Sequence, residues 1–282
     1  MAPASASFVH RRPLSVGGRV GKLGSADSGA RRIRRLLPLW TLREIRVQYR
    51  QSALDVGWTL LTPVITLAGY GFVLTRAFNV DGDGVPYLTF AWTGVVVWTF
   101  VANALARGAL SLVASADLVR KVSFPHEVVP IATVFAAGLD LVIGMGVLAV
   151  LMAIQGITPN VTLAAVVPVF AVLFVVVIAS SVIFATVTAF VRDLAHGLNV
   201  FLRIGIFVTP VMYPVSVVPA RYEWALQVNT ITVLIEATRD SVLRGRWPNW
   251  GLLGVHAAFW TGMLAFARWY VRRVGGRIAD VI

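Results

Sequence analysis

The chain alternates between long apolar stretches and short polar connections. A helix of about 20 apolar residues crosses a hydrocarbon layer about 30 Å thick, so a stretch of that length with at most one charged residue is a candidate span. Six stretches meet this condition, near residues 57-76, 86-106, 128-155, 162-190, 198-218 and 250-268. The pattern predicts an all-α integral membrane protein with six transmembrane helices.

Composition supports a membrane environment. Hydrophobic residues make up 57% of the chain and charged residues only 13%, whereas soluble domains carry about 25% charged residues. Residues 141–191 contain no Asp, Glu, Lys or Arg. We therefore interpret residues 36-282 as one membrane domain without an inserted soluble domain.

The amino-terminal segment has a different composition. Residues 1-35 are rich in Gly, Ser, Ala and Arg and lack the apolar core of a secretory signal. Such a composition is typical of a disordered segment, which we expect to be a cytoplasmic tail.

The distribution of basic residues predicts the orientation. An inside amino terminus places 20 of the 25 Lys and Arg residues on the cytoplasmic side, with Arg107 and Arg203 among them. The positive-inside rule therefore predicts that both termini are cytoplasmic. The net charge of +12 has no nucleic-acid-binding motif beside it, so we expect no nucleic-acid partner. The chain has no cysteine, which excludes disulfides and thiolate metal sites.

Two segments outside the spans have helical periodicity. Before the first span, apolar residues share one helix face, which predicts an amphipathic helix at the membrane interface: Leu42, Ile45, Tyr49, Ala53 and Val56. Arg43, Arg46 and Arg50 flank this face and either bind lipid phosphates or act as a plain positive-inside anchor. Between spans five and six, residues 219–250 predict a short external helical hairpin, re-entrant or interfacial.

Several short motifs point to one family. Residues 47–58 read VQYRQSALDVGW and residues 117–130 read DLVRKVSFPHEVVP, followed by FVRDL at 190–194, TPVMYP at 209–214, and Arg239 with LRG at 243–245. In these motifs the chain resembles the permease subunits of polysaccharide ABC exporters, the family of O-antigen (Wzm) and teichoic-acid permeases. It departs from their pattern at Asp55, His126 and Thr230.

The resemblance implies a mechanism. In that family a short cytoplasmic segment docks on a separate ABC ATPase, and here it implies that the ATPase-coupling residues are Leu118, Arg120, Lys121, Phe124, Pro125, His126 and Glu127. It further implies a homodimer of this chain with two ATPase copies. ATP and Mg²⁺ would bind the ATPase, because no phosphate-binding loop is present here and this chain needs no cofactor of its own.

Asp140 lies in the middle of the third span, where an ionisable group is unfavourable unless it is paired or hydrated. It is either a functional intramembrane group or a buried carboxylate hydrogen-bonded to neighbouring helices. Aromatic residues within the first two spans either belong to interfacial belts or stack on sugar rings in a glycan channel. For the channel lining we select Tyr70, Phe72, Trp92 and Phe100.

The leading hypothesis is the transmembrane subunit of an ATP-driven exporter that moves a lipid-linked polysaccharide of the O-antigen, galactan or teichoic-acid type across the bacterial cytoplasmic membrane. An exporter of a drug or a free lipid is the first alternative. A polyprenyl-lipid glycosyl or acyl transferase is the second, and it would need converging acids where the sequence offers Asp81, Asp83 and the isolated Asp140. We expect no catalytic residue and no metal site.

Overall fold

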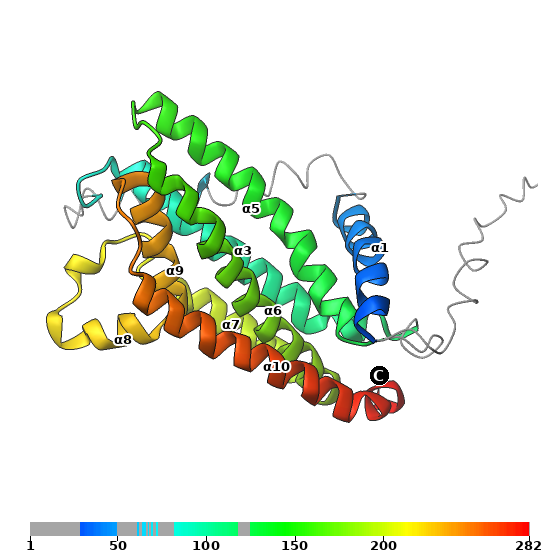
Figure 1. Ribbon diagram of the computed structural model, residues 1–282. Helices are drawn as coiled ribbons and strands as arrows, with labels where there is room; N and C mark the ends of the chain where they lie inside the picture. Colours follow the sequence, from blue (N-terminus) through cyan, green and yellow to red (C-terminus); the bar gives the residue numbers. More distant parts are fainter. Residues whose placement is uncertain are drawn as a thin grey trace, which may run out of the picture.

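The computed structural model of the chain describes residues 29–49, 82–117 and 125–281, together with residues 61, 64, 65, 67, 69 and 72 (Figure 1). Every regular element in this part of the chain is helical, which confirms the all-α part of the predicted fold class. The long helices are α1 (Gly29–Tyr49), α3 (Tyr87–Ala114), α5 (Val128–Ile154), α6 (Val166–Phe190), α7 (Asp193–Val208) and α10 (Trp250–Val281). The short ones are η3 (Val161–Ala165), η4 (Val215–Val217), η5 (Ala220–Tyr222), α8 (Glu223–Val228), α9 (Thr230–Arg239) and the π-helical turn η6 (Asp240–Arg244).

Four helical segments of the described chain are long and apolar enough to cross a membrane. They are Tyr87–Ala114, Val128–Ile154, Val161–Phe190 and Trp250–Ile278, and they correspond to the second, third, fourth and sixth predicted spans. Most of the first predicted span lies outside the described residues. The protein is thus an integral membrane protein with four candidate spanning helices, and the total of six stays a prediction.

The fifth predicted span does not form one helix. α7 has 16 residues, about 24 Å of helix at 1.5 Å per residue, which is shorter than a hydrocarbon layer. It ends because Pro210 disfavours helical geometry in the residue before it, and Thr209 indeed has an extended ψ of 132°. The prediction of a helix over 198-218 was therefore wrong at its outer half, where residues 209–214 form an irregular turn.

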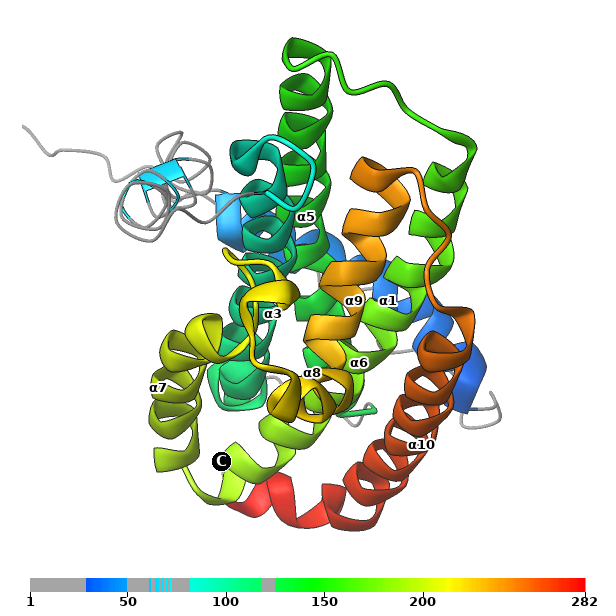
Figure 2. The same ribbon diagram turned by 90° about the vertical axis from the view of Figure 1, so that its left-hand side faces the viewer.

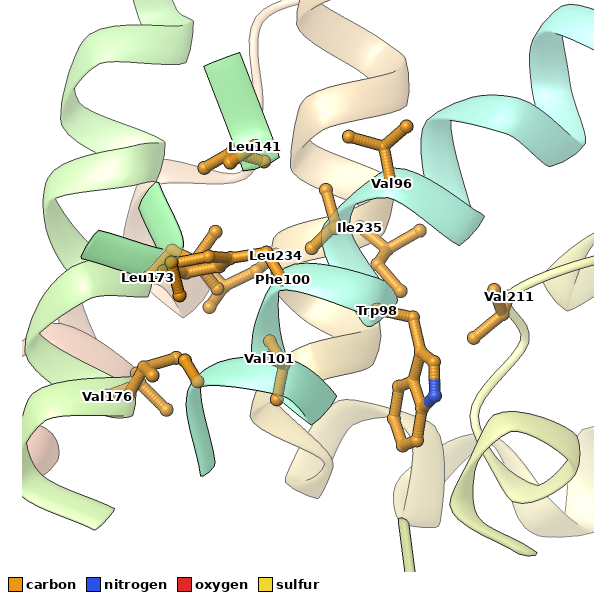
Figure 3. Close-up of a cluster of buried hydrophobic side chains, with 14 of the residues drawn as sticks. Val96, Trp98, Phe100, Val101, Leu141, Leu173, Val176, Val211, Leu234 and Ile235 are labelled. Carbon is orange, nitrogen blue, oxygen red and sulfur yellow. The ribbon is translucent and has the colours of Figure 1, made fainter. Parts of the chain in front are cut away.

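α3 is the central helix of the bundle. It packs against α5 and α6, and α10 packs against the far side of α6. In the most apolar stretch of α3, 78% of the residues are buried, whereas only 17% are buried in the corresponding stretch of α10. α10 therefore faces outward. Figure 3 shows the core between these helices, with Phe100 of α3 beside Leu173 of α6 and Leu234 of α9.

A second, smaller apolar cluster closes one end of the bundle. It brings together the last turns of α3, α6 and α10 with the first turn of α5, through Leu112, Val129, Ala185, Ala189 and Ile278. Leu36 and Trp40 of α1 pack against it. This is the end that the charge count predicts to be cytoplasmic, and we call it the inner end of the bundle. Figure 1 shows α1 beside the inner half of α5 and the carboxyl terminus of α10 at the same end.

α1 begins earlier than the sequence indicated. It starts at Gly29, so the predicted tail 1-35 extends too far and its last seven residues belong to the helix. The reason is that Leu36 and Trp40 find an apolar partner on the bundle, although arginines surround them in the sequence. Leu42, assigned to the apolar face, is 45% exposed instead. Residues 50–56 of the predicted amphipathic helix lie outside the described residues.

The segment between α7 and α10 forms two short helices. α8 and α9 meet at Asn229, whose side-chain oxygen accepts hydrogen bonds from the backbone N–H groups of Ile231 and Thr232 and caps α9. α9 packs on α3 and α6. Helical structure between the fifth and sixth predicted spans is therefore present, whereas its relation to the membrane stays a prediction.

Candidate functional site

Glu127 is the centre of an ionic cluster at the inner end of the bundle. It stands immediately before α5 and is only 1% exposed. Its Oε2 accepts a hydrogen bond from Nε of Arg268 at 3.1 Å, and its Oε1 accepts one from Nη2 of Arg272 at 3.0 Å. The two arginines are four residues apart on α10, so they project from the same helix face. We call these three residues the inner clamp.

His126 extends the contact between this segment and α10. A Cβ added to Gly275 would lie 3.2 Å from Nδ1 of His126, so the imidazole rests against a glycine of α10. Burial lowers the pKa of His126 below its ordinary value, which favours the neutral ring at pH 7. His126 and Glu127 together therefore hold the start of α5 against α10.

The predicted ATPase-coupling residues fall into two groups. Leu118, Arg120, Lys121 and Phe124 lie outside the described residues. Pro125 and His126 are partly exposed, whereas the Glu127 carboxylate is buried within the chain. Both oxygens of Glu127 are bound by arginines of α10 within the chain, and its role in ATPase coupling stays a prediction.

Asp140 takes part in a second ionic cluster, deeper in the bundle. Its side chain is 4% exposed and accepts a hydrogen bond from Nη2 of Arg107 at 2.9 Å. Nε2 of Gln48 lies 3.2 Å and 3.3 Å from the two carboxylate oxygens. Asp140 thus joins α5 to α3 and α1, which is the arrangement expected of a buried carboxylate hydrogen-bonded to neighbouring helices.

The sequence analysis missed Arg107 as a residue of α3 that pairs with Asp140. The predicted second span ends at residue 106, so Arg107 was counted as part of a cytoplasmic loop. In the structure α3 continues to Ala114, and Arg107 lies in its second half with its side chain against Asp140. Its sequence separation of 33 residues from Asp140 left no local signal of the pair.

The arginines predicted to bind phosphate lie on or after α1. Arg43 and Arg46 are exposed, and Arg50 lies outside the described residues. Arg43 donates to Glu44 at 3.2 Å and stacks 4.9 Å above the ring of Trp40. Both described guanidinium groups are thus accessible at the inner end, as a head-group contact requires.

The predicted channel residues differ in exposure, and one of them lies outside the described residues. Phe72 is 68% exposed, and Tyr70 lies outside the described residues. Trp92 and Phe100 are core residues with 2% and 1% exposure. Nε1 of Trp92 donates to the carbonyl of Gly144 at 3.0 Å, and Phe100 packs on Phe174 with 5.1 Å between ring centroids. Both rings are covered by α5 and α6 within the single chain, and their assignment to a channel stays a prediction.

A third ionic cluster lies at the opposite, outer end of the bundle and centres on Arg239. This side chain has no exposed surface and donates to the carbonyls of Pro210 at 3.0 Å and Val211 at 2.5 Å. It also binds Glu236 at 2.7 Å, and its guanidinium lies 3.6 Å from the centre of the Phe90 ring. Arg239 thereby supplies hydrogen bonds to the irregular turn that follows α7.

Arg244 connects the remaining members of this outer cluster. It donates to Glu236 at 2.8 Å, to Asp240 at 2.9 Å and to Asp83 at 2.8 Å. Asp83 therefore serves as an ion-pair partner between the loop before α3 and η6. Among the described residues, no group of three or more His, Cys, Asp or Glu side chains could hold a metal ion.

An apolar cavity of about 380 Å³ separates α7 from α6. Trp98 of α3 forms one wall, Phe184 of α6 and Phe201 of α7 form the sides, and Trp260 of α10 lies at the end near α9. The carboxamide of Asn229 donates to the hydroxyl of Thr209 at 3.0 Å at the same end. The cavity thus has apolar walls and one polar end.

Comparisons with known proteins identify what this arrangement is similar to. The sequence profile of the family described as ABC-2 type transporter matches residues 36–243. An O-antigen export system permease protein RfbA of Klebsiella pneumoniae is 26% identical over 212 residues, which cover 74% of this chain and 81% of the relative. A protein of the same name from Myxococcus xanthus is 29% identical over 178 residues, covering 62% and 67% of the two chains.

Proposed function

The chain belongs to the ABC-2 type transporter family, and we propose that it is the membrane subunit of an ATP-driven exporter of a lipid-linked polysaccharide. The observation that carries this proposal is the similarity to permeases of O-antigen export systems over most of the bundle. As an ABC-2 permease the chain is a transport subunit rather than an enzyme, and an ABC ATPase supplies the energy. The polymer is of the O-antigen, galactan or teichoic-acid type, and the membrane is the bacterial cytoplasmic membrane.

The assembly in this proposal has two copies of the chain and two ATPase subunits, related by two-fold symmetry. Both termini lie in the cytoplasm, as the distribution of Lys and Arg favours. ATP and Mg²⁺ bind the ATPase subunits, and this chain carries no cofactor. The translocation path runs between or along the two bundles rather than past the buried rings of Trp92 and Phe100.

The inner clamp gives this proposal a route for mechanical coupling. Leu118, Arg120, Lys121 and Phe124 contact the ATPase, with Phe124 as the apolar anchor and the cations facing acidic partner residues. Movement of that segment reaches Glu127, which follows Phe124 after Pro125 and His126. Charge-assisted hydrogen bonds from Arg268 and Arg272 then transmit the movement to α10.

The exposed arginines at the inner end fit the first contact with an anionic lipid carrier. Arg43 and Arg46 of α1 are accessible, and guanidinium groups bind phosphate oxygens in a bidentate manner. Arg50 completes the same series in the sequence. The Asp140 cluster holds α1 in place, because Gln48 at the end of α1 donates hydrogen bonds to Asp140.

The proposal is tested by reconstituting the chain with its ATPase in vesicles and supplying a labelled lipid-linked glycan at the ATPase side. We expect the label to become accessible at the other side only when ATP is present and the ATPase is active. A matched complex with Phe124→Asp should bind the ATPase weakly and export little. Export of a drug or an unglycosylated lipid in place of the glycan, or export that needs no ATPase, would overturn the proposal.

A further inference from the structure

α7 has an unusual exposed face for a helix in this bundle. Arg192, His196, Asn199 and Arg203 follow one another at intervals of four, three and four residues, so they form one stripe along the helix. Arg192, His196 and Arg203 are exposed and Asn199 is half-buried. We call these four residues the α7 stripe. Figure 2 shows α7, drawn in yellow-green, at the edge of the bundle.

Arg203 lies at mid-depth in the bundle and not near its inner end. It is the eleventh residue of α7, about 15 Å from the start of the helix. Two residues further on, Gly205 rests against the ring of Trp98, since an added Cβ would lie 2.6 Å from Cη2 of that ring. Trp98 is itself in the middle third of α3. The assignment of Arg203 to the cytoplasmic charge count therefore does not describe its depth.

Three polar side chains of the stripe have no side-chain partner among the residues that the structure describes. The side chains of Arg192, His196 and Arg203 make no hydrogen bond or ion pair in the part of the chain that the structure describes. Asn199 donates to the carbonyl of Ala195 at 2.9 Å. Asp193 is the acid nearest in sequence, and it lies about 100° away around the first turn of α7. This contrasts with Arg107, Arg239 and Arg244, each of which binds a carboxylate.

An exposed arginine at this depth is unfavourable in contact with lipid, and such residues face an aqueous path or an anionic partner. Arg203 cannot reach the membrane surface with its side chain when its backbone lies near the middle of a hydrocarbon layer about 30 Å thick. We infer that the α7 stripe is a binding site for the phosphate or pyrophosphate group of the lipid carrier along the translocation path. This inference rests on the proposed export function and names the substrate group that α7 recognises.

Charge complementarity selects this ligand. Two guanidinium groups separated by 11 residues along one face offer successive bidentate sites for tetrahedral phosphate oxygens, about 16 Å apart. The carboxamide of Asn199 and the imidazole of His196 lie between them and offer further hydrogen bonds. A phosphate group could therefore pass from Arg192 at the inner end to Arg203 at mid-depth without meeting an acidic side chain on the stripe.

The chain contains no cysteine, which allows a labelling experiment with single introduced thiols. Val200 borders the stripe three residues before Arg203 and is 57% exposed; Phe259 on the outward face of α10 is also 57% exposed. The variants Val200→Cys and Phe259→Cys are each placed in vesicles with the ATPase and treated with a water-soluble anionic methanethiosulfonate. Farnesyl pyrophosphate serves as the phosphate probe and farnesol as its uncharged control.

We expect Val200→Cys to react at least about tenfold faster than Phe259→Cys, because only the first lies beside water. Farnesyl pyrophosphate should slow the reaction severalfold and farnesol should not. When Arg203→Gln is added to Val200→Cys, about tenfold more farnesyl pyrophosphate should be needed for the same protection. This is the change expected for the loss of one charge-assisted bond. Arg203→Lys should retain part of the protection.

Equal slow labelling of both thiols overturns the inference, because it places the stripe in lipid or against a second copy of the chain. Protection by farnesol, or protection that persists with Arg203→Gln, also overturns it. None of these readouts uses transport. A wild-type complex that fails to export glycan would therefore refute the proposed function, whereas wild-type export with unprotected Val200→Cys would refute the phosphate site alone.

Discussion

The two ends of the bundle contain ionic clusters of different design. The outer cluster gathers Glu236, Arg239, Asp240 and Arg244 from nine consecutive residues of one segment, and only Asp83 comes from elsewhere. The inner clamp joins Glu127 to Arg268 and Arg272, which are 141 and 145 residues away in sequence. The outer cluster thus stiffens one local structure, and the inner clamp connects two helices.

Burial is also distributed differently within the two clusters. At the outer end the arginine is the buried partner, with no exposed surface at Arg239. At the inner end the carboxylate is buried, whereas the side chains of Arg268 and Arg272 are 40% and 60% exposed. Partly hydrated arginines can shift their position while they remain bound. This difference fits a fixed support at the outer end and, as we propose, a joint that can move at the inner end.

The largest effect is expected for Arg239→Ala. The substitution leaves the carbonyls of Pro210 and Val211 without their donor and Glu236 without one of its two cations. Breaking a buried pair of this kind lowers the free energy of unfolding by about 4 kcal/mol. Thermal unfolding of the purified chain in detergent measures the loss, with Arg221→Ala on the exposed η5 as the matched control. Equal unfolding temperatures for the two variants would contradict the role of Arg239.

Loss of both clamp arginines should have the next largest effect. The double variant Arg268→Gln with Arg272→Gln leaves the Glu127 carboxylate buried without a cation, and we expect a loss of about 2 to 3 kcal/mol. The single variant Glu127→Gln should lose only about 1 kcal/mol, because both arginines can then be hydrated. The same unfolding assay measures this asymmetry. A greater loss of stability for Glu127→Gln than for the double variant would contradict the description of Glu127 as the buried partner.

A smaller effect is expected in the deeper cluster. Asp140→Asn retains an oxygen that can accept from Arg107 or Gln48 and loses only the ionic part of the contact, about 1 kcal/mol. We expect faster hydrogen exchange in α1 as its attachment to α5 weakens, with the core of α3 unchanged. Arg107→Ala should have the larger effect of the two, because it leaves the Asp140 carboxylate buried without its cation. Unaltered exchange in α1 for both variants would remove the link between this cluster and α1.

The smallest effect is expected for Asp83→Asn. Asp83 is 49% exposed, and Arg244 keeps two other carboxylates when this one is lost. Exposed ion pairs contribute little, so the change should stay below about 0.5 kcal/mol. Thermal unfolding beside the wild-type chain measures it. A loss as large as that of Arg239→Ala would mean that the outer cluster depends on the loop before α3.

Local periodicity was sufficient to predict much of the fold. The second, third, fourth and sixth predicted spans match helices within a few residues where they begin, because apolar length alone determines them. The fifth did not match, because Pro210 interrupts a stretch that is apolar throughout. α3 extends beyond its predicted last residue because Arg107 pairs with Asp140 inside the bundle. A hydropathy pattern predicts that a spanning helix ends at a charged residue. Only the tertiary pairing of that residue shows that the helix continues.

The candidate site was less predictable for the same reason. The motif around Phe124 and Pro125 could be found from the sequence, and so could Asp140 as an unusual membrane residue. The partners of Glu127 and Asp140 could not, since they come from distant helices with no local pattern. Arg268 and Arg272 offered one weak signal, two arginines on one face at the end of a span. Aromatic type alone did not separate the core rings of Trp92 and Phe100 from exposed ones.

The amount of glycan exported per ATP hydrolysed tests most directly the central claim, that the inner clamp couples an ATPase to the membrane helices. The measurement compares vesicles containing the wild-type complex with vesicles containing Glu127→Gln, at equal amounts of assembled complex. We predict that Glu127→Gln still binds the ATPase and hydrolyses ATP but exports at least about tenfold less glycan per ATP, as expected when charge-assisted bonds between the coupling segment and α10 are lost. An unchanged ratio in a correctly assembled Glu127→Gln complex would contradict the claim.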